Sequence, residues 1–203
     1  HVNYSYGAAK IRVLSDVNAD FESGKMYAIT GPSGAGKSTL LSLLAGLDAP
    51  SDGVVRFEGG NIAETGYSKH RREHVSLVFQ DHNLIDYLTP EENLRLVNPK
   101  ADMKILEDLG LSREESKRNI MHLSGGQRQR VAVGRALVAP GRAILADEPT
   151  GSLDPEMTDE VIDLLRHAAH QLGKCVIVVT HSKRVADSAD AVYTLRHKKL
   201  AKA

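Results

Sequence analysis

Short apolar runs alternate with stretches of helical spacing along this chain. The runs that predict β-strands cover residues 11–22, 25–30, 54–57, 74–79, 143–146 and 175–180. The stretches that predict helices cover residues 37–45, which Gly46 would end, and 155–171, where Pro155 suits the first helical position. Strands that alternate with helices are typical of an α/β fold, and the two last runs, apolar on both faces, suit the centre of a parallel sheet.

The segment between about residues 90 and 122 has a different character. It is richer in charge, and residues 91–96 and 103–109 have helical spacing, with Gly110 placed to end the second helix. We therefore expect a small helical insert between the strands.

Composition narrows the possible function classes. The chain has 203 residues with 26 basic and 26 acidic side chains, so its formal charge is zero. This balance argues against broad nucleic-acid binding, which relies on basic surfaces. Hydrophobic residues make up 41% of the chain, enough for a core, and a single cysteine excludes an internal disulfide. No apolar run approaches the roughly 20 residues that a membrane-spanning helix needs.

The strongest local motif lies between the predicted strand 25–30 and the predicted helix 37–45. Residues 31–38 read Gly-Pro-Ser-Gly-Ala-Gly-Lys-Ser and match the phosphate-binding pattern G-x-x-x-x-G-K-[ST] in full. Glycines let backbone N–H groups turn inward around phosphates, and the start of the following helix adds positive potential. We expect Lys37 to reach the β- and γ-phosphates of a nucleotide and Ser38 to hold Mg²⁺.

Two acidic residues follow the buried run 143–146. Asp147, at the end of such a strand, fits the carboxylate that acts on Mg²⁺ and its waters in P-loop nucleotide hydrolases. Glu148 fits a general base that polarises the attacking water. An acidic pair after a strand is often only a solvated loop, and the complete phosphate loop is what favours the catalytic interpretation here.

A second candidate anion site precedes the helical stretch that contains Arg128 and Arg135. Ser124 suits an N-cap, and Gly125 and Gly126 leave backbone N–H groups open at the start of the helix. Taken alone, the segment is an ordinary capped helix. Its combination with the phosphate loop favours a second segment that faces phosphate.

This set of motifs resembles the nucleotide-binding subunit of ATP-binding-cassette (ABC) proteins, and the resemblance covers essentially the whole chain. The matching segments are residues 31–39 for the Walker A loop, 123–127 for the signature LSGGQ, and Asp147 with Glu148 for Walker B. Further matches are Gln80 for the Q-loop glutamine, residues 152–154 for the D-loop, His181 for the switch histidine, and Tyr6 for the aromatic residue that stacks on adenine.

The resemblance implies a single ABC ATPase domain over residues 1–203. Its fold would be α/β, a P-loop NTPase core with a mainly parallel sheet, an N-terminal antiparallel β subdomain and a short helical subdomain over about residues 83–134. It implies that Glu148, His181, Gln80 and Lys37 are catalytic and that Ser38, Gln80 and Asp147 meet Mg²⁺. ATP would meet Tyr6, Gly31, Pro32, Ser33, Gly34, Ala35, Gly36, Lys37, Ser38, Thr39, Ser124, Gly125, Gly126, Gln127 and Asp154.

The resemblance also implies partners. Two copies of the chain would form a head-to-tail dimer around two ATP molecules, with the Walker A loop of one copy facing residues 124–127 of the other. Separate transmembrane permease subunits would dock at about residues 81–88, and no nucleic acid would bind. The form of residues 146–154 resembles the group that serves lipoprotein release, macrolide efflux and antimicrobial-peptide export. Such a subunit works peripherally on the cytoplasmic face of a bacterial membrane.

Two other function classes share part of this pattern. A soluble ABC ATPase of repair, translation or iron–sulfur assembly would carry the same motifs, but repair and translation members usually have long inserts or duplicated cassettes, which this chain lacks. A nucleotide-binding scaffold without hydrolysis is disfavoured by the intact residues Lys37, Asp147, Glu148 and His181. Membrane association and ATPase activity separate the three classes.

Several other residues are interpreted as structural. The pairs His70/His74 and His167/His170 have metal-binding spacing but lack obvious further ligands, so we expect solvated helix faces. Cys175 begins a buried strand and is expected to pack rather than to react.

Two features depart from the family pattern. Gly134 lies inside a predicted helix, where a helix-forming residue would be up to ~1 kcal/mol better, and this suggests close packing at that position. The stretch between Gln80 and Ser124 is about ten residues shorter than the resemblance implies, so either the helical subdomain is trimmed or the sequence lacks residues there.

Overall fold

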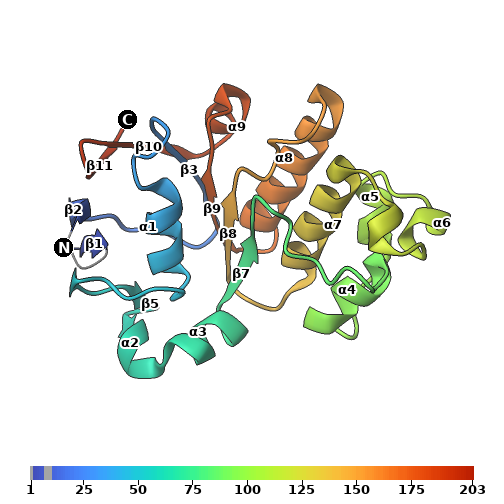
Figure 1. Cartoon of the computed structure of the whole chain (residues 1–203), viewed down its shortest axis with the longest axis horizontal. Coiled ribbons are helices and arrows are strands. Elements are labelled where there is room, and N and C mark those ends of the chain that lie inside the picture. Colours follow the sequence, from blue (N-terminus) through green and yellow to red (C-terminus); the bar gives the residue numbers. More distant parts are fainter. Residues whose placement is uncertain (1, 7–10) are drawn as a thin grey trace.

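The computed structural model describes residues 2–6 and 11–203 and has one large sheet with helices on both faces (Figure 1). The strand order is β11-β10-β3-β9-β8-β7, and all neighbours are parallel except β11, which is antiparallel to β10. The strands are β3 (Met26–Thr30), β7 (Val75–Val78), β8 (Ala143–Asp147), β9 (Cys175–Val179), β10 (Ala191–Arg196) and β11 (Lys199–Lys202). The expected α/β fold with a mainly parallel sheet is confirmed.

The central strands β8 and β9 are almost entirely buried, as their apolar runs predict. Because side chains alternate along a strand, Ile144 and Val176 pack in one core with α7 (Gly125–Val138) and α8 (Pro155–His170). Leu145 and Ile177 pack in a second core with α1 (Lys37–Leu44). Figure 1 shows the result, with α1 on one face of the sheet and α7 and α8 on the other.

The long helices begin at the capping residues that the sequence places there. Asp154 accepts a hydrogen bond from the N–H of Met157, and Pro155 occupies the first turn of α8. Ser124 and Gln127 form a reciprocal capping box at the start of α7. Such local hydrogen bonds satisfy N–H groups that have no partner within the helix, and they fix where each helix begins.

A small antiparallel sheet with the order β2-β1-β4 confirms the N-terminal β subdomain. It contains β1 (Val2–Tyr6), β2 (Ile11–Val17) and β4 (Asp52–Gly53), and it is followed by a hairpin of β5 (Arg56–Phe57) and β6 (Gly60–Asn61). The predicted strand 11–22 was too long. The backbone of Asp16 turns to a φ of 52°, and the Asn18 amide donates to the Asp16 carbonyl oxygen, so the strand ends at Val17.

The remaining helices are short. They are α2 (Ile62–Thr65), α3 (Tyr67–Glu73), α4 (Pro90–Val97), α5 (Lys104–Asp108), α6 (Arg113–Ser116), the 3₁₀ helix η1 (Ile120–His122) and α9 (Lys183–Asp187). The helices predicted over 91–96 and 103–109 correspond to α4 and α5, and both pack against α7. Over residues 2–6 and 11–203, no helix is long and apolar enough to cross a membrane.

Gly134 lies where α7 meets the end of α5. A Cβ atom at this position would come within 2.9 Å of Cδ1 of Leu109, a residue that is fully buried. The interpretation that Gly134 permits close packing is therefore confirmed.

The expected solvated face around His70 is wrong. His70 is only 2% exposed; its Nε2 lies 3.0 Å from the Leu44 carbonyl oxygen and its Nδ1 lies 3.3 Å from Nδ1 of His74. Phe57 stacks on His74 with ring centroids 4.6 Å apart. The pair thus packs α3 against α1 and the β5–β6 hairpin, and burial lowers the pKa of His70. In the described part of the chain, no cluster of three or more His, Cys, Asp or Glu side chains could hold a metal ion.

Cys175 opens β9 with its side chain in the core between the sheet and α1. It is 8% exposed, and burial raises the pKa of its thiol to about 11. The expected packing role is confirmed, because a thiol in this environment stays protonated and unreactive at neutral pH.

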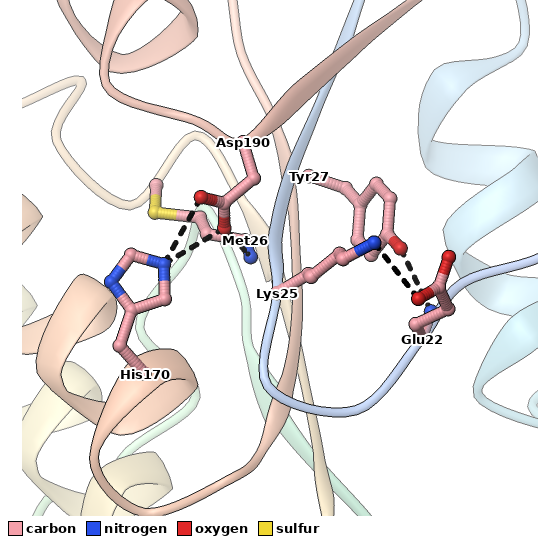
Figure 2. A network of polar contacts seen from close by, with 6 residues as sticks. All are labelled: Glu22, Lys25, Met26, Tyr27, His170 and Asp190. Atoms are coloured by element: carbon pink, nitrogen blue, oxygen red, sulfur yellow. Dashed lines mark hydrogen bonds and ion pairs between the residues drawn. The ribbon is translucent and has the colours of Figure 1, made fainter.

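A polar network fixes the start of β3 (Figure 2). The carboxylate of Asp190, just before β10, accepts a hydrogen bond of 2.7 Å from the N–H of Met26 and lies 2.9 Å from Nε2 of His170 at the end of α8. Burial opposes the charge on Asp190, but these hydrogen bonds outweigh it and hold the pKa of Asp190 below its ordinary value. The network therefore positions the strand that leads into the glycine-rich loop.

Candidate functional site

A cavity of about 360 Å³ lies at the carboxyl ends of the parallel strands. Crevices at this edge of an open α/β sheet are where such folds bind ligands. The cavity gathers most of the residues that the sequence singles out, although they come from distant parts of the chain. Its lining residues are Val13, Ser33, Gly34, Gly36, Lys37, Ser38, Thr39, Gln80, Asp147, Glu148 and His181.

The glycine-rich loop joins β3 to α1 in a conformation that only glycine adopts easily. The φ angles of Gly34 and Gly36 are 73° and 101°. A Cβ on Gly36 would lie 2.8 Å from Cγ1 of Val13, and one on Gly31 would lie 2.4 Å from the carbonyl oxygen of Leu195. No side chain caps α1, so its first N–H groups are available to an anion in the cavity.

Lys37 places a cation at the base of this loop. The residue is 7% exposed, and its Nζ donates hydrogen bonds of 2.9 Å and 3.0 Å to the carbonyl oxygens of Gly31 and Pro32. The same Nζ lies 3.3 Å from Nε2 of His181. The ammonium group is thus held at the floor of the cavity, where an anionic ligand can meet it.

Glu148 places a carboxylate next to His181 in the same cavity. Its backbone has a φ of 48°, and its N–H donates to the carbonyl oxygen of Val179, which turns the chain sharply after β8. Oε2 accepts a hydrogen bond of 3.2 Å from Oγ1 of Thr180. Oε1 lies 3.6 Å from Nε2 of His181 and has no hydrogen-bond partner among the residues that the structure describes. One oxygen is therefore oriented by the protein, and the other is buried beside His181 without a hydrogen-bond partner in the described chain.

Thr180 is a site residue that the sequence analysis did not predict. It is fully buried, donates to Glu148, and accepts a hydrogen bond from the N–H of Ser182. It lies directly before His181, but nothing in its spacing distinguishes it from any threonine at the end of a strand. Its role follows only from the pairing of β9 with β8, which brings the ends of the two strands together.

The signature segment does not reach this cavity in its own chain. Ser124 and Gln127 cap α7, and Asp154 caps α8, whereas none of residues 124–127 or Asp154 lines the cavity. The two segments lie beside each other, since a Cβ on Gly126 would be 3.4 Å from the carbonyl oxygen of Ser152. A Cβ on Gly125 would meet no described atom within 4 Å, so this helix start faces open space.

The other predicted ligand residues fall into two groups. Gly31, Pro32 and Ala35 belong to the glycine-rich loop without lining the cavity. The backbone of Tyr6 ends β1, but its side chain, predicted to stack on adenine, lies outside the described residues.

Comparison with known proteins places this geometry in a family. A family model described as "ABC transporter" matches residues 14–151. This chain therefore belongs to the ABC transporter family, and it is an ATP-binding cassette of the kind that couples ATP hydrolysis to transport.

Three relatives give a closer comparison. The chain is 37% identical over 93% of its length to the uncharacterized ABC transporter ATP-binding protein YclH of Bacillus subtilis, covering 88% of that protein. It is 38% identical over 96% of its length to the lipoprotein-releasing system ATP-binding protein LolD of Rickettsia felis, covering 91% of it. It is 37% identical over 96% of its length to the macrolide export ATP-binding/permease protein MacB of Escherichia coli K12, but spans only 32% of that protein.

A solved structure confirms the fold. The ATP-binding cassette MJ0796, in a dimeric post-hydrolysis state bound to ADP and Pi, superposes with a TM-score of 0.90. The sequences are 32% identical, and the match covers 99% of this chain and 96% of the other. The P-loop NTPase core that the motifs imply is thus present over the whole described chain.

Proposed function

We propose that this chain binds Mg-ATP in the cavity and hydrolyses it between two copies of itself, to drive a separate membrane permease. The observation that carries the proposal is the meeting of Lys37, Glu148 and His181 at the floor of one cavity beside the glycine-rich loop. A cation, a carboxylate and an imidazole around a loop of N–H donors form the set that phosphoryl transfer to water requires.

The loop and Lys37 would hold the phosphates. The N–H groups at the start of α1 would face the triphosphate, and the Lys37 ammonium, which donates to the Gly31 carbonyl oxygen in this structure, would contact the β- and γ-phosphates. The residues in contact with the nucleotide would be Gly31, Pro32, Ser33, Gly34, Ala35, Gly36, Lys37, Ser38 and Thr39 in this loop, with Tyr6 on the adenine.

The donor set fits Mg²⁺. Ser38, Gln80 and Asp147 line the cavity with a hydroxyl, an amide and a carboxylate, and Mg²⁺ prefers oxygen ligands of these kinds. When bound, Mg²⁺ would neutralise part of the phosphate charge that develops during transfer.

Glu148 would act as the general base. Thr180 fixes one carboxylate oxygen, and the other, Oε1, is left to accept a proton from the attacking water. The water oxygen would bond to the γ-phosphorus while the bond to the β–γ bridging oxygen breaks, leaving ADP and phosphate. His181, 3.6 Å from the same oxygen, would contact the γ-phosphate and hold the water.

The second copy would complete each site. Residues 124–127 lie outside the cavity of their own chain and present an open helix start at Gly125, which can donate N–H groups to a phosphate held by another copy. Asp154 at the start of α8 would contact the opposite site in the same way. In this proposal residues 1–203 act as one ABC ATPase domain, with residues 83–134 as its helical subdomain.

We propose that this chain works peripherally at the cytoplasmic face of a bacterial membrane, and the names of two relatives support a membrane setting. LolD and MacB are named for lipoprotein release and macrolide export, and MacB carries its permease in the same protein. An exporter or a machine that transmits force through a permease is therefore the proposed setting for this chain.

A dimerisation assay tests the proposal. Glu148→Gln with Mg-ATP should form a dimer in light scattering and bind ATP without turnover. Gly125→Glu in the same background should still bind ATP but remain monomeric. The added carboxylate suits the start of its own helix and meets nothing of its own chain at Cβ, but it would repel the nucleotide of a partner. A Gly125→Glu chain that still dimerises with ATP would contradict the head-to-tail arrangement.

The permease partner needs its own experiment. Tagged Glu148→Gln protein should be recovered from detergent-solubilised source membranes, with Mg-ATP present, and its partners identified by mass spectrometry. A stoichiometric multi-span protein supports the transport proposal. Recovery of soluble partners only, under several detergents, would overturn it in favour of a soluble ABC ATPase.

A further inference from the structure

Two reciprocal capping boxes begin α6 and α7. In α6, the N–H of Ser112 donates a hydrogen bond of 2.8 Å to Oε2 of Glu115, and the N–H of Glu115 donates one of 3.2 Å to the Ser112 hydroxyl. In α7, the N–H of Ser124 donates one of 2.9 Å to Oε1 of Gln127, and the N–H of Gln127 donates one of 3.2 Å to the Ser124 hydroxyl. Each box fixes the start of its own helix.

A further hydrogen bond joins the two boxes. Nε2 of Gln127, on α7, donates over 2.6 Å to Oε1 of Glu115, on α6, and both side chains are half-buried. The Glu115 carboxylate thus accepts from Ser112 with one oxygen and from Gln127 with the other. These hydrogen bonds, that of the Ser112 N–H above all, hold the pKa of Glu115 below its ordinary value, so the carboxylate is charged at neutral pH.

The bond to Glu115 fixes which way the Gln127 amide points. An amide carries an acceptor on one side and a donor on the other, whereas a carboxylate can only accept. With its NH2 group held by Glu115, Gln127 must turn Oε1 toward the N–H of Ser124. The exposed Ser124 hydroxyl accepts from the Gln127 N–H and has no acceptor of its own among the described residues, so its proton can be donated to a ligand.

This arrangement has a consequence for residues 124–127. We propose that Glu115 is a positioning residue that holds the Gln127 amide and so keeps this start of α7 in the form that donates to the partner's phosphate. Glu115 does not line the cavity of its own chain, and Figure 1 shows α6 at the far side of the molecule from α1. The inference rests on the proposed function, in which residues 124–127 of one copy meet the nucleotide of the other.

Glu115→Gln tests the contact with little change of shape. Glutamine can still close a capping box with Ser112, but its NH2 group would then face the NH2 group of Gln127, and two donors form no hydrogen bond. Glu92→Gln is the matched control. Glu92 closes the capping box of α4 with Thr89 over the same distances, 2.8 Å and 3.2 Å, and in the described chain no hydrogen bond joins its side chain to α7.

Hydrogen exchange shows whether the contact orders the start of α7. Exchange of the Ser124 N–H, followed by NMR, should accelerate about three- to tenfold in Glu115→Gln, the worth of one hydrogen bond, and should not change in Glu92→Gln. A chain with both Glu115→Gln and Gln127→Glu swaps donor and acceptor, because a carboxylate at position 127 can accept from Ser124 and from the new amide together. Its Ser124 exchange should return toward the wild-type rate.

Dimerisation shows whether this order matters for function. In the Glu148→Gln background with Mg-ATP, Glu115→Gln should raise the dimer dissociation constant about three- to tenfold in analytical ultracentrifugation, whereas Glu92→Gln should leave it unchanged. Binding of a fluorescent ATP analogue to the dilute monomer should be equal in all chains, since Glu115 lies outside the cavity. A general loss of stability would instead weaken ATP binding together with dimerisation, and a thermal melt verifies folding.

Three results would overturn the inference. They are a wild-type rate of Ser124 exchange in Glu115→Gln, a swapped pair that exchanges as fast as Glu115→Gln alone, and a dimer dissociation constant that Glu115→Gln shares with Glu92→Gln. A Glu148→Gln chain that stays monomeric with Mg-ATP would instead contradict the proposed function itself. The two failures are therefore distinguishable.

Discussion

The Nζ atom of Lys37 lies 3.3 Å from Nε2 of His181, although 144 positions separate the two residues in the sequence. The parallel pairing of β3 with β9 produces this contact, since Lys37 follows the carboxyl end of one strand and His181 the end of the other. The relationship makes the cation and the imidazole parts of one site.

His181→Ala should therefore lower kcat for ATP by about 10- to 100-fold, the cost of one hydrogen bond to a charged group. ATP binding should change little, because Lys37 keeps its loop carbonyl partners. Stopped-flow nucleotide binding and steady-state hydrolysis separate the two effects. Loss of ATP affinity with unchanged kcat would contradict the assignment of His181 to the transfer step.

Thr180→Val should also reduce turnover, by about 10-fold or more, because it leaves one oxygen of the Glu148 carboxylate without its hydroxyl donor. Valine has nearly the volume of threonine, so packing is kept. Thr180→Ser is the matched control and should retain most of the activity. Equal kcat values for the valine and serine variants would show that the hydroxyl does not orient Glu148.

Gly134→Ala should destabilise the protein by about 1–3 kcal/mol, because its Cβ would come too close to Leu109 in a well-packed core. Gly125→Ala, on the same helix, is the control, since its Cβ would meet nothing within 4 Å. Urea unfolding of both variants measures the difference. A Gly134→Ala chain as stable as wild type would mean that α5 can shift freely against α7.

His70 should make the protein less stable in acid. Because burial lowers its pKa, the unfolded chain binds a proton in a range where the folded chain does not. The contribution of the neutral, buried His70 ring to the free energy of unfolding is fully present above the ordinary pKa of 6.5. This contribution is lost as the pH falls below 6.5 toward the lowered pKa of the folded protein. Urea unfolding at pH 7.5 and 5.5 should show a smaller loss for His70→Gln than for wild type. His167→Ala, an exposed histidine, should lose as much as wild type.

The sequence predicted the parts of the site that depend on local pattern. Residues 31–38 could be interpreted from spacing alone, because the glycines, Lys37 and Ser38 act within one loop and one helix start. Strands β8 and β9 could also be predicted from local pattern, because a strand that is apolar on both faces is stable only when both faces are buried. Pro155 and Ser124 marked helix starts through local effects: the fixed φ of proline suits the first helical turn, and the Ser124 hydroxyl accepts a hydrogen bond from the N–H of Gln127.

The site and packing residues that sequence analysis misjudged or missed depend on contacts between segments that are distant in the sequence. His70 was expected in solvent, but α3 turns it onto the Leu44 carbonyl and Phe57, which no spacing along α3 could indicate. The contact of Thr180 with Glu148 likewise joins segments that only the strand order brings together. The predicted strand over 11–22 failed for a smaller reason, the turn that Asn18 makes with Asp16.

Cys175 has a practical consequence for studying motion in this cassette. It is the single cysteine of the chain, it is buried, and burial raises the pKa of its thiol to about 11. Maleimide and iodoacetamide reagents should therefore not modify it at neutral pH. A cysteine introduced at an exposed position such as His122 or His167 would then carry a fluorophore or a spin label alone. Distances between labelled copies can therefore be measured on single-cysteine variants in which the buried Cys175 is left unchanged.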